Sequence, residues 1–186
     1  MNSVIKISVG LLLAATLHIG GLSASAQSIA GLKGEFTSFS EFGHHPYGGA
    51  ATVGWQLKMI LVQMDMGYDR YSPMMQEGQT AGRGVIQRMH MDLSIMPRIY
   101  GNRSHSINAY LGAGVTGGVR FEDPAEGEPE GSAKSCFLPG VFPEVQGEFF
   151  VARRTALFVD VRVPYYFMEE AENPEVRYAL GVRWMF

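Results

Sequence analysis

The sequence predicts an all-β fold, a small antiparallel up-and-down transmembrane β-barrel of about eight strands. Three observations support this prediction. The N-terminal segment has the pattern of a secretory signal, most of the remaining chain alternates between apolar and polar residues, and the connections between the alternating segments are short and long in turn. A length of 186 residues is typical of one domain.

Residues 1–26 are expected to form a cleaved signal peptide. Lys6 supplies its positive charge, residues 7–17 are apolar, and small residues end in Ala24-Ser25-Ala26, an A-x-A cleavage pattern. The apolar stretch is shorter than the ~20 residues that a membrane-spanning helix needs. A short N-terminal anchor helix is the alternative, and a lipid anchor is disfavoured because no Cys ends the segment. Residues 27–186 are the expected barrel, located in the outer membrane.

The composition of residues 27–186 argues against two classes of protein. Removing Lys6 from the 15 Lys and Arg leaves 14, against 18 Asp and Glu, a formal charge of −4 that gives no support for direct nucleic-acid binding. Cys136 is the only cysteine, so no intrachain disulfide can form. Apolar residues make up 46% of the full 186-residue chain, without a long apolar stretch after the signal, as in barrels whose lipid-facing residues are spaced by two.

The first four predicted strands differ in how clearly they alternate. The first alternates only in part. In the third and fourth, Met and aliphatic residues alternate with charged or polar residues. This period of two places the two kinds on opposite faces and is typical of a strand. No turn-forming residues separate the second from the third, and we place a tight turn near Lys58. These strands are residues 32–39, 51–57, 60–69 and 88–95.

The last four predicted strands are more regular. The fifth is rich in glycine, and Gly112 and Gly114 are expected to relieve crowding inside the barrel. In the eighth, the even positions from Val176 onward are apolar or aromatic, whereas the odd positions are small residues, Met or Arg. These strands are residues 106–121, 141–151, 157–166 and 176–186.

The predicted connections alternate in length. Outer-membrane barrels have an even number of strands, short periplasmic turns and longer extracellular loops, so the alternation places both ends of the barrel chain in the periplasm. The long connections are residues 40–48, 72–84, 122–137 and 168–174. The short ones are near residue 58 and at 99–105 and 152–154.

The polar faces of these strands are expected to line the lumen. An eight-stranded barrel is just wide enough for side chains to fill, so no open pore is expected. Charges removed from water must be paired, and Arg forms bidentate bonds with carboxylates. The alternative is that these charges form the solvated face of a soluble sheet. The predicted lumenal ionic network comprises Arg88, Asp92, Arg120, Glu144, Glu148, Asp160, Arg162, Arg177 and Arg183, with Arg98, Asp65 and Asp69 on the same face.

The C-terminal strand ends in an aromatic residue. A terminal aromatic on an amphipathic last strand resembles the signal that the barrel-assembly machinery recognises. Tyr178, Trp184 and Phe186 are therefore the candidate assembly signal, with this machinery and outer-membrane lipid as expected partners.

No catalytic site, metal site or cofactor is predicted. His90 and Ser94 share a face, but at ~3.3 Å per residue they are about 13 Å apart, too far for a nucleophile and its base. We expect His90 to be a lumenal residue beside Asp92 or Arg88. His44-His45 lacks further metal ligands, and the acidic residues from Glu122 to Glu130 lack the ladder of a calcium loop.

The C-terminal half, residues 85–186, contains "YLGAGVTGGVRFE", a long acidic loop, "GVFPEVQGEFFVARRTALFVDVRV" and the last strand "VRYALGVRWMF". With these segments in this order, it resembles the TraO family of conjugative transposons. The resemblance implies a small barrel and a structural role in the conjugal DNA-transfer apparatus, with other conjugation proteins as partners and no catalytic residues. The alternative hypothesis is a general small barrel that binds ligands or anchors at the surface through its outer loops.

Overall fold

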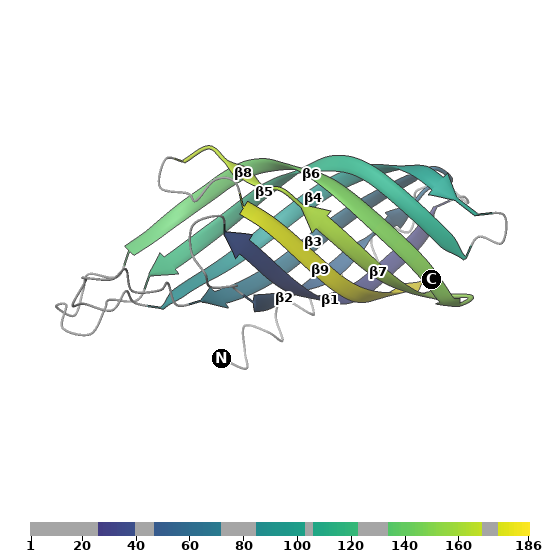
Figure 1. The fold of residues 1–186 in the computed structure, drawn as a ribbon, viewed down its shortest axis with the longest axis horizontal. Coiled ribbons are helices and arrows are strands. Elements are labelled where there is room, and N and C mark those ends of the chain that lie inside the picture. The colour runs from purple at the N-terminus through teal and green to yellow at the C-terminus, as the bar shows by residue number, and fades with distance from the viewer. Residues whose placement is uncertain (1–25, 40–46, 72–84, 103–105, 123–133, 169–174) are drawn as a thin grey trace.

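The protein, in a computed structural model, is a closed antiparallel β-barrel (Figure 1). The predicted signal peptide, except its last residue, lies outside the described residues, as do His44-His45 and most of the acidic loop. In the described part of the chain no helix is long and apolar enough to cross a membrane. The structure describes residues 26–39, 47–71, 85–102, 106–122, 134–168 and 175–186.

Antiparallel pairing runs around the whole wall. The order is β5-β4-β3-β2-β1-β9-β7-β6, and the pairing of β5 with β6 closes the ring. The strands are β1 (Gln27–Phe39), β2 (Tyr47–Gln56), β3 (Ile60–Tyr71), β4 (Ile86–Gly101), β5 (Ile107–Glu122), β6 (Lys134–Ala152), β7 (Thr155–Arg162), β8 (Tyr165–Tyr166) and β9 (Glu175–Met185).

The two-residue β8 continues β7 as one strand of the wall. Both pair with β6 in a single register, Arg162 opposite Glu144 and Tyr165 opposite Val141. Pro164 interrupts them because proline has no backbone N–H to donate. The barrel therefore has eight strands in effect, which confirms the predicted fold class.

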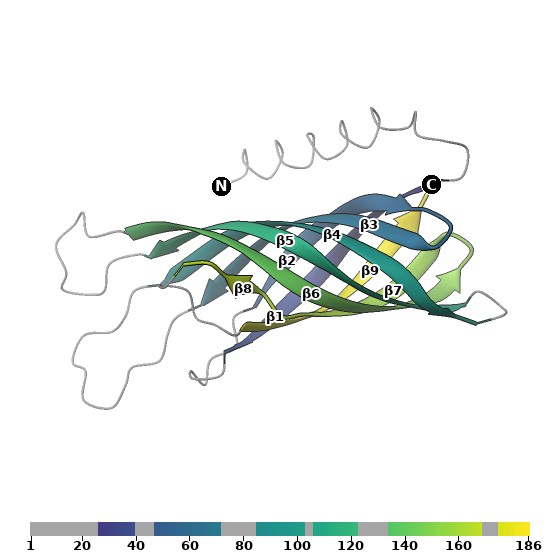
Figure 2. The ribbon, with the colours of Figure 1, turned by 90° about the horizontal axis from the view of Figure 1, so that it is seen from above.

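The two ends of the barrel differ in their connections (Figures 1 and 2). At the turn end, which also holds the C-terminus, the links are residues 57–59, 102–106 and 153–154. At the loop end, the strands are joined by the longer links 40–46, 72–85, 123–133 and 167–174. The predicted tight turn is confirmed, because Leu57 N donates to Ile60 O at 2.8 Å around Lys58 and Met59.

Several strands extend beyond their predicted ends. β5 and β6 pair as far as Glu122 with Lys134, so residues 134–137, expected in the longest loop, belong to the wall. β4 continues to Gly101 through a bulge between Arg98 and Tyr100. Sequence alternation missed these ends because apolar and polar residues share one face there, as with the inward Met96 and Arg98 at the end of β4.

Side chains alternate around the wall, with apolar residues outward. On β4 the outward Met89, Met91, Leu93 and Ile95 are 46–56% exposed, whereas the intervening inward residues are buried. This polarity is the reverse of a soluble barrel, whose apolar residues face inward. The outer surface is therefore an apolar band around a polar interior.

The turn end of the interior holds an apolar cluster. Side chains from six strands fill the lumen there, and the partly buried Phe150 packs against them. This plug was not predicted, since each of the six strands contributes a single member among polar neighbours. It comprises Ile29, Leu61, Met96, Tyr110, Ala156 and Met185.

Candidate functional site

The candidate site is the ionic lumen, a set of buried charged residues on the inward faces of β1, β3, β4, β6, β7 and β9. All are at most 5% exposed. Carboxylates outnumber cations among the described buried residues, with eight of the former and five of the latter. The cations are Lys33, Arg88, Arg162, Arg177 and Arg183. The carboxylates are Glu35, Asp65, Asp69, Asp92, Glu144, Glu148, Asp160 and Glu175.

Arg162 is the centre of the middle layer. Its Nε and Nη2 donate to Glu144 Oε1 at 3.0 and 2.8 Å, Nη1 donates to Asp92 Oδ2 at 3.0 Å, and Nη2 also donates to Asp65. Asp160 lies 3.5 Å from its Nε. One guanidinium thus joins carboxylates from β3, β4, β6 and β7 across the barrel.

Lys33 is the second cation of the middle layer. Its Nζ donates to Asp65 Oδ2 at 2.9 Å and to Asp160 Oδ2 at 3.4 Å, and lies 3.0 Å from Glu35 Oε1. Thr52 Oγ1 donates to the other Asp65 oxygen at 2.6 Å. The Asp65 carboxylate of β3 is therefore held from three other strands, β1, β2 and β7.

The loop-end layer is built on Glu175, which accepts hydrogen bonds from two guanidinium groups. Arg88 donates to it at 2.6 and 2.8 Å and to Asp69 at 2.7 and 3.0 Å. Arg177 Nε donates to Glu175 at 2.6 Å, and its Nη2 donates to Tyr166 Oη. Arg177 Nη1 also reaches the middle layer at Asp92 Oδ2, 3.5 Å away.

The turn-end layer is built on Arg183. It donates to Glu148 and Gln63, and to Gln146 Oε1 at 3.2 Å. Tyr110 Oη, above the apolar plug, donates to Glu148 Oε2 at 2.9 Å. The Gln63 amide then donates to Asp65 at 2.9 Å, so an amide rather than an ion pair links this layer to the middle one.

Inward glycines make room for rings beneath two of these guanidinium groups. Gly114 lies opposite Phe142, and a Cβ at Gly114 would overlap the Phe142 ring. The Arg162 guanidinium lies 5.3 Å from the centroid of that ring, a cation–π distance. Gly181 and Phe158 repeat this arrangement: they lie opposite each other, and a Cβ at Gly181 would overlap the Phe158 ring. The Arg183 guanidinium lies 4.5 Å from the centroid of that ring.

The structure places eight of the nine predicted network residues in these layers and corrects the ninth. Arg120, 14% exposed at its side chain, pairs with Glu122 near the loop-end rim and joins none of the layers. The reason is its position, only two residues before β5 ends. Arg98 likewise lies at the turn-end rim, donating to Met59 Sδ at 3.2 Å.

Sequence reasoning missed three members of the lumen. Lys33 and Glu35 lie on β1, where alternation of polar and apolar residues is hard to recognise. The inward face of β1 also holds the apolar Ile29, and its outward face also holds Gly34. Glu175 falls between the predicted loop, residues 168–174, and the predicted last strand, residues 176–186, although its parity matches Arg177 and Arg183. Extending the β9 alternation back by one residue would have found it.

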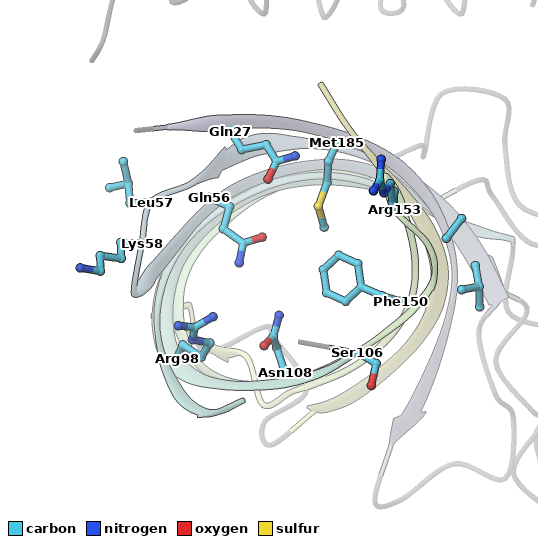
Figure 3. Close-up of a pocket in the computed structure, with 12 residues that line it drawn as sticks. Gln27, Gln56, Leu57, Lys58, Arg98, Ser106, Asn108, Phe150, Arg153 and Met185 are labelled. Atoms are coloured by element: carbon cyan, nitrogen blue, oxygen red, sulfur yellow. The ribbon is translucent and has the colours of Figure 1, made fainter. Parts of the chain in front are cut away.

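The mouth of the barrel at the turn end is polar and open. It forms a cavity of about 550 Å³, and Figure 3 shows Gln56, Asn108, Phe150 and Met185 pointing into it. Gln56 Nε2 donates to Tyr110 Oη at 2.7 Å, which connects the mouth to the turn-end layer. The plug beneath this mouth separates it from the charged layers.

The predicted assembly signal lies on the outward face of β9. Tyr178, Trp184 and Phe186 are 48%, 41% and 73% exposed. Phe186 N donates to Ser28 O on β1 at 2.9 Å, which holds the last residue against the strand that closes the barrel. The three aromatic rings therefore belong to the apolar outer surface.

Comparisons with known proteins show the fold. No family model matches the chain, and no curated protein matches it. It is similar to the crystal structure of the outer membrane protein OprG from Pseudomonas aeruginosa (TM-score 0.69, 12% identity, 90% of this chain and 99% of that one). It is also similar to Neisserial surface protein A (0.61, 16%, 88% and 98%) and to Ail of Yersinia pestis (0.57, 10%, 87% and 97%). The chain thus has the fold of small outer-membrane barrels.

Proposed function

We propose that the protein is a non-enzymatic outer-membrane barrel that serves as a closed, membrane-anchored component of a larger apparatus rather than as a pore. The observation that carries this proposal is the combination of an apolar outer band with a lumen filled by ion-paired side chains. Porins that leave an aqueous channel use about 16–18 strands. An eight-stranded wall filled by five cations and eight carboxylates is suited to anchoring.

The outer band supports the membrane location. Its residues are aliphatic or aromatic along β4, β7 and β9, and such a surface is stable when lipid covers it. The charged side chains of the lumen are enclosed by the wall and do not contact lipid. Export by the signal peptide at residues 1–26, with the turn end facing the periplasm, is part of the same proposal.

The apparatus that we propose is the conjugal DNA-transfer machinery. This step rests on the resemblance of residues 85–186 to the TraO family. Loops and rims, rather than the filled lumen, would contact other conjugation proteins, while outer-membrane lipid and the assembly machinery are the remaining partners. Nucleic acid is not an expected ligand.

Deleting the gene in a donor cell tests the proposed role. We expect the frequency of conjugal transfer to fall and to be restored by the wild-type gene supplied in trans. Transfer that is unchanged in the deletion strain would contradict the conjugation role. It would favour the alternative, surface binding through the outer loops, in line with the likeness to Ail, whose structure was determined in complex with a heparin analogue.

A further inference from the structure

The buried charges of the lumen do not balance. Eight carboxylates and five cations leave an excess of three negative charges among the described residues that are buried, if His90 is neutral. Buried charges are stable only when paired or bound to a metal. The lumen therefore has the electrostatics of a cation site.

Three of the buried carboxylates surround His90. Nε2 of this residue lies 3.1 Å from Glu35 Oε2 and 3.8 Å from Asp92 Oδ2, and Nδ1 lies 3.6 Å from Asp69 Oδ2. Ligand atoms of His90, Glu35 and Asp69 all fall within 4.8 Å of one another. Three strands, β1, β3 and β4, thus bring three carboxylates to one imidazole.

Several atoms of this cluster make no hydrogen bond. The His90 side chain is fully buried, yet neither ring nitrogen is aligned with an acceptor, the 3.1 Å approach to Glu35 included. Glu35 Oε2 and Asp92 Oδ1 are also buried without a hydrogen bond. Buried polar atoms nearly always have a partner. Here the orphaned atoms are of the types that bind metal ions.

The wall leaves space for the imidazole. His90 lies opposite Gly67 across β3 and β4, and a Cβ at Gly67 would overlap the ring. The same hypothetical Cβ would come within 3.0 Å of Glu35 Oε2. The niche therefore sets both the position of the ring and its approach to Glu35.

We propose that this cluster, the lumenal His–carboxylate site, binds one divalent first-row metal ion of the Zn²⁺ type. His90 Nε2 and Glu35 Oε2 are its direct ligands and Asp92 Oδ1 is the third, while Asp69 Oδ2, 3.6 Å from Nδ1, lies on the other side of the ring. Imidazole and carboxylate are ordinary Zn²⁺ ligands, and a carboxylate on the second nitrogen of a metal-bound His is the usual outer-shell partner.

The distances suit such an ion. Zn²⁺ bound tetrahedrally at about 2.0–2.2 Å places neighbouring ligand atoms about 3.3–3.6 Å apart. The 3.1 Å between Nε2 and Glu35 Oε2 lies just below this range, whereas the 3.8 Å from Nε2 is to Asp92 Oδ2, the oxygen that Arg162 and Arg177 hold. Two positive charges also offset most of the excess of three. Lys33 contacts Glu35 through Oε1, and the arginines bind Asp92 through Oδ2. The second oxygen of each carboxylate, Glu35 Oε2 and Asp92 Oδ1, makes no hydrogen bond.

Zinc content tests the site directly. The full mature chain is refolded in detergent with Zn²⁺, desalted and measured by elemental analysis. We expect about one ion per wild-type chain and at least a roughly ten-fold lower content in His90→Gln and in Glu35→Gln. Asp69→Asn should retain binding with about 10–100-fold weaker affinity.

The controls separate binding from folding. Glu122→Gln removes a carboxylate at the rim and Ser94→Ala changes a neighbour on the inward face of β4, and both should keep the wild-type zinc content. Each variant is first shown to be folded by heat-modifiable migration on gels. Wild type that carries no more zinc than His90→Gln, or equal losses in Glu122→Gln, would overturn the proposal.

Discussion

Replacing Arg162 by Leu is expected to lower the free energy of unfolding by about 3–5 kcal/mol, the cost of leaving buried charges without their partner. The Arg162 guanidinium bonds to Glu144, Asp92 and Asp65 and is 1% exposed at its side chain. Leucine would fill part of the space but would leave these carboxylates facing one another without their shared cation. Urea unfolding in detergent micelles, followed by tryptophan fluorescence, measures the change.

The neighbouring position provides the matched control. Val161 precedes Arg162 on β7 but faces outward, 39% exposed. Val161→Leu should change the free energy of unfolding by no more than about 0.5 kcal/mol, as for other surface substitutions. Equal stability of Arg162→Leu and wild type would mean that the middle layer is not the ionic centre of the barrel.

Deleting Phe186 is expected to reduce strongly the amount of folded barrel in the outer membrane. Phe186 ends the outward aromatic row of β9, and its backbone N–H bonds to β1 at the seam between the first and last strands. Removing it takes away both the terminal ring and that bond. Immunoblots of isolated outer membranes, with unheated and heated samples compared, report the folded fraction.

Two further measurements distinguish recognition from stability. Phe186→Tyr keeps an aromatic ring and should assemble at the wild-type level. The deletion variant refolded from urea into detergent should unfold close to the wild-type midpoint, because the lumenal layers do not involve Phe186. Wild-type amounts of the deletion variant in the outer membrane would show that the terminal ring is not an assembly signal.

The fold could be predicted where one face is uniformly apolar. β7, β9 and residues 88–95 of β4 alternate without interruption, and their parity alone assigned the inward positions. β1 could not be assigned with the same clarity, since Ile29 faces inward in the plug while Gly34 faces outward. Alternation reports the environment of a strand, and that environment changes from ionic to apolar along the lumen.

The site could be predicted only as a set of residues. Parity places Arg162 and Asp160 inside, but it does not say which carboxylates meet across the barrel, because strand tilt brings Asp65 of β3 to Arg162 of β7. It also does not reveal the Gly67 niche for His90, which depends on cross-strand register. The prediction that Arg120 belongs to the lumenal network was wrong because parity gives no information about the position of a residue along the barrel axis.

Lipid contact of the outer band is the most direct test of the inside-out polarity. Single cysteines at Leu93, Val159 and Leu180, in a Cys136→Ser background, would carry nitroxide labels in protein reconstituted into lipid vesicles. The account predicts that collisions with oxygen exceed collisions with a water-soluble nickel chelate at all three positions. Labels that collide mainly with the nickel chelate would contradict the polar-inside, apolar-outside barrel and with it the proposed membrane location.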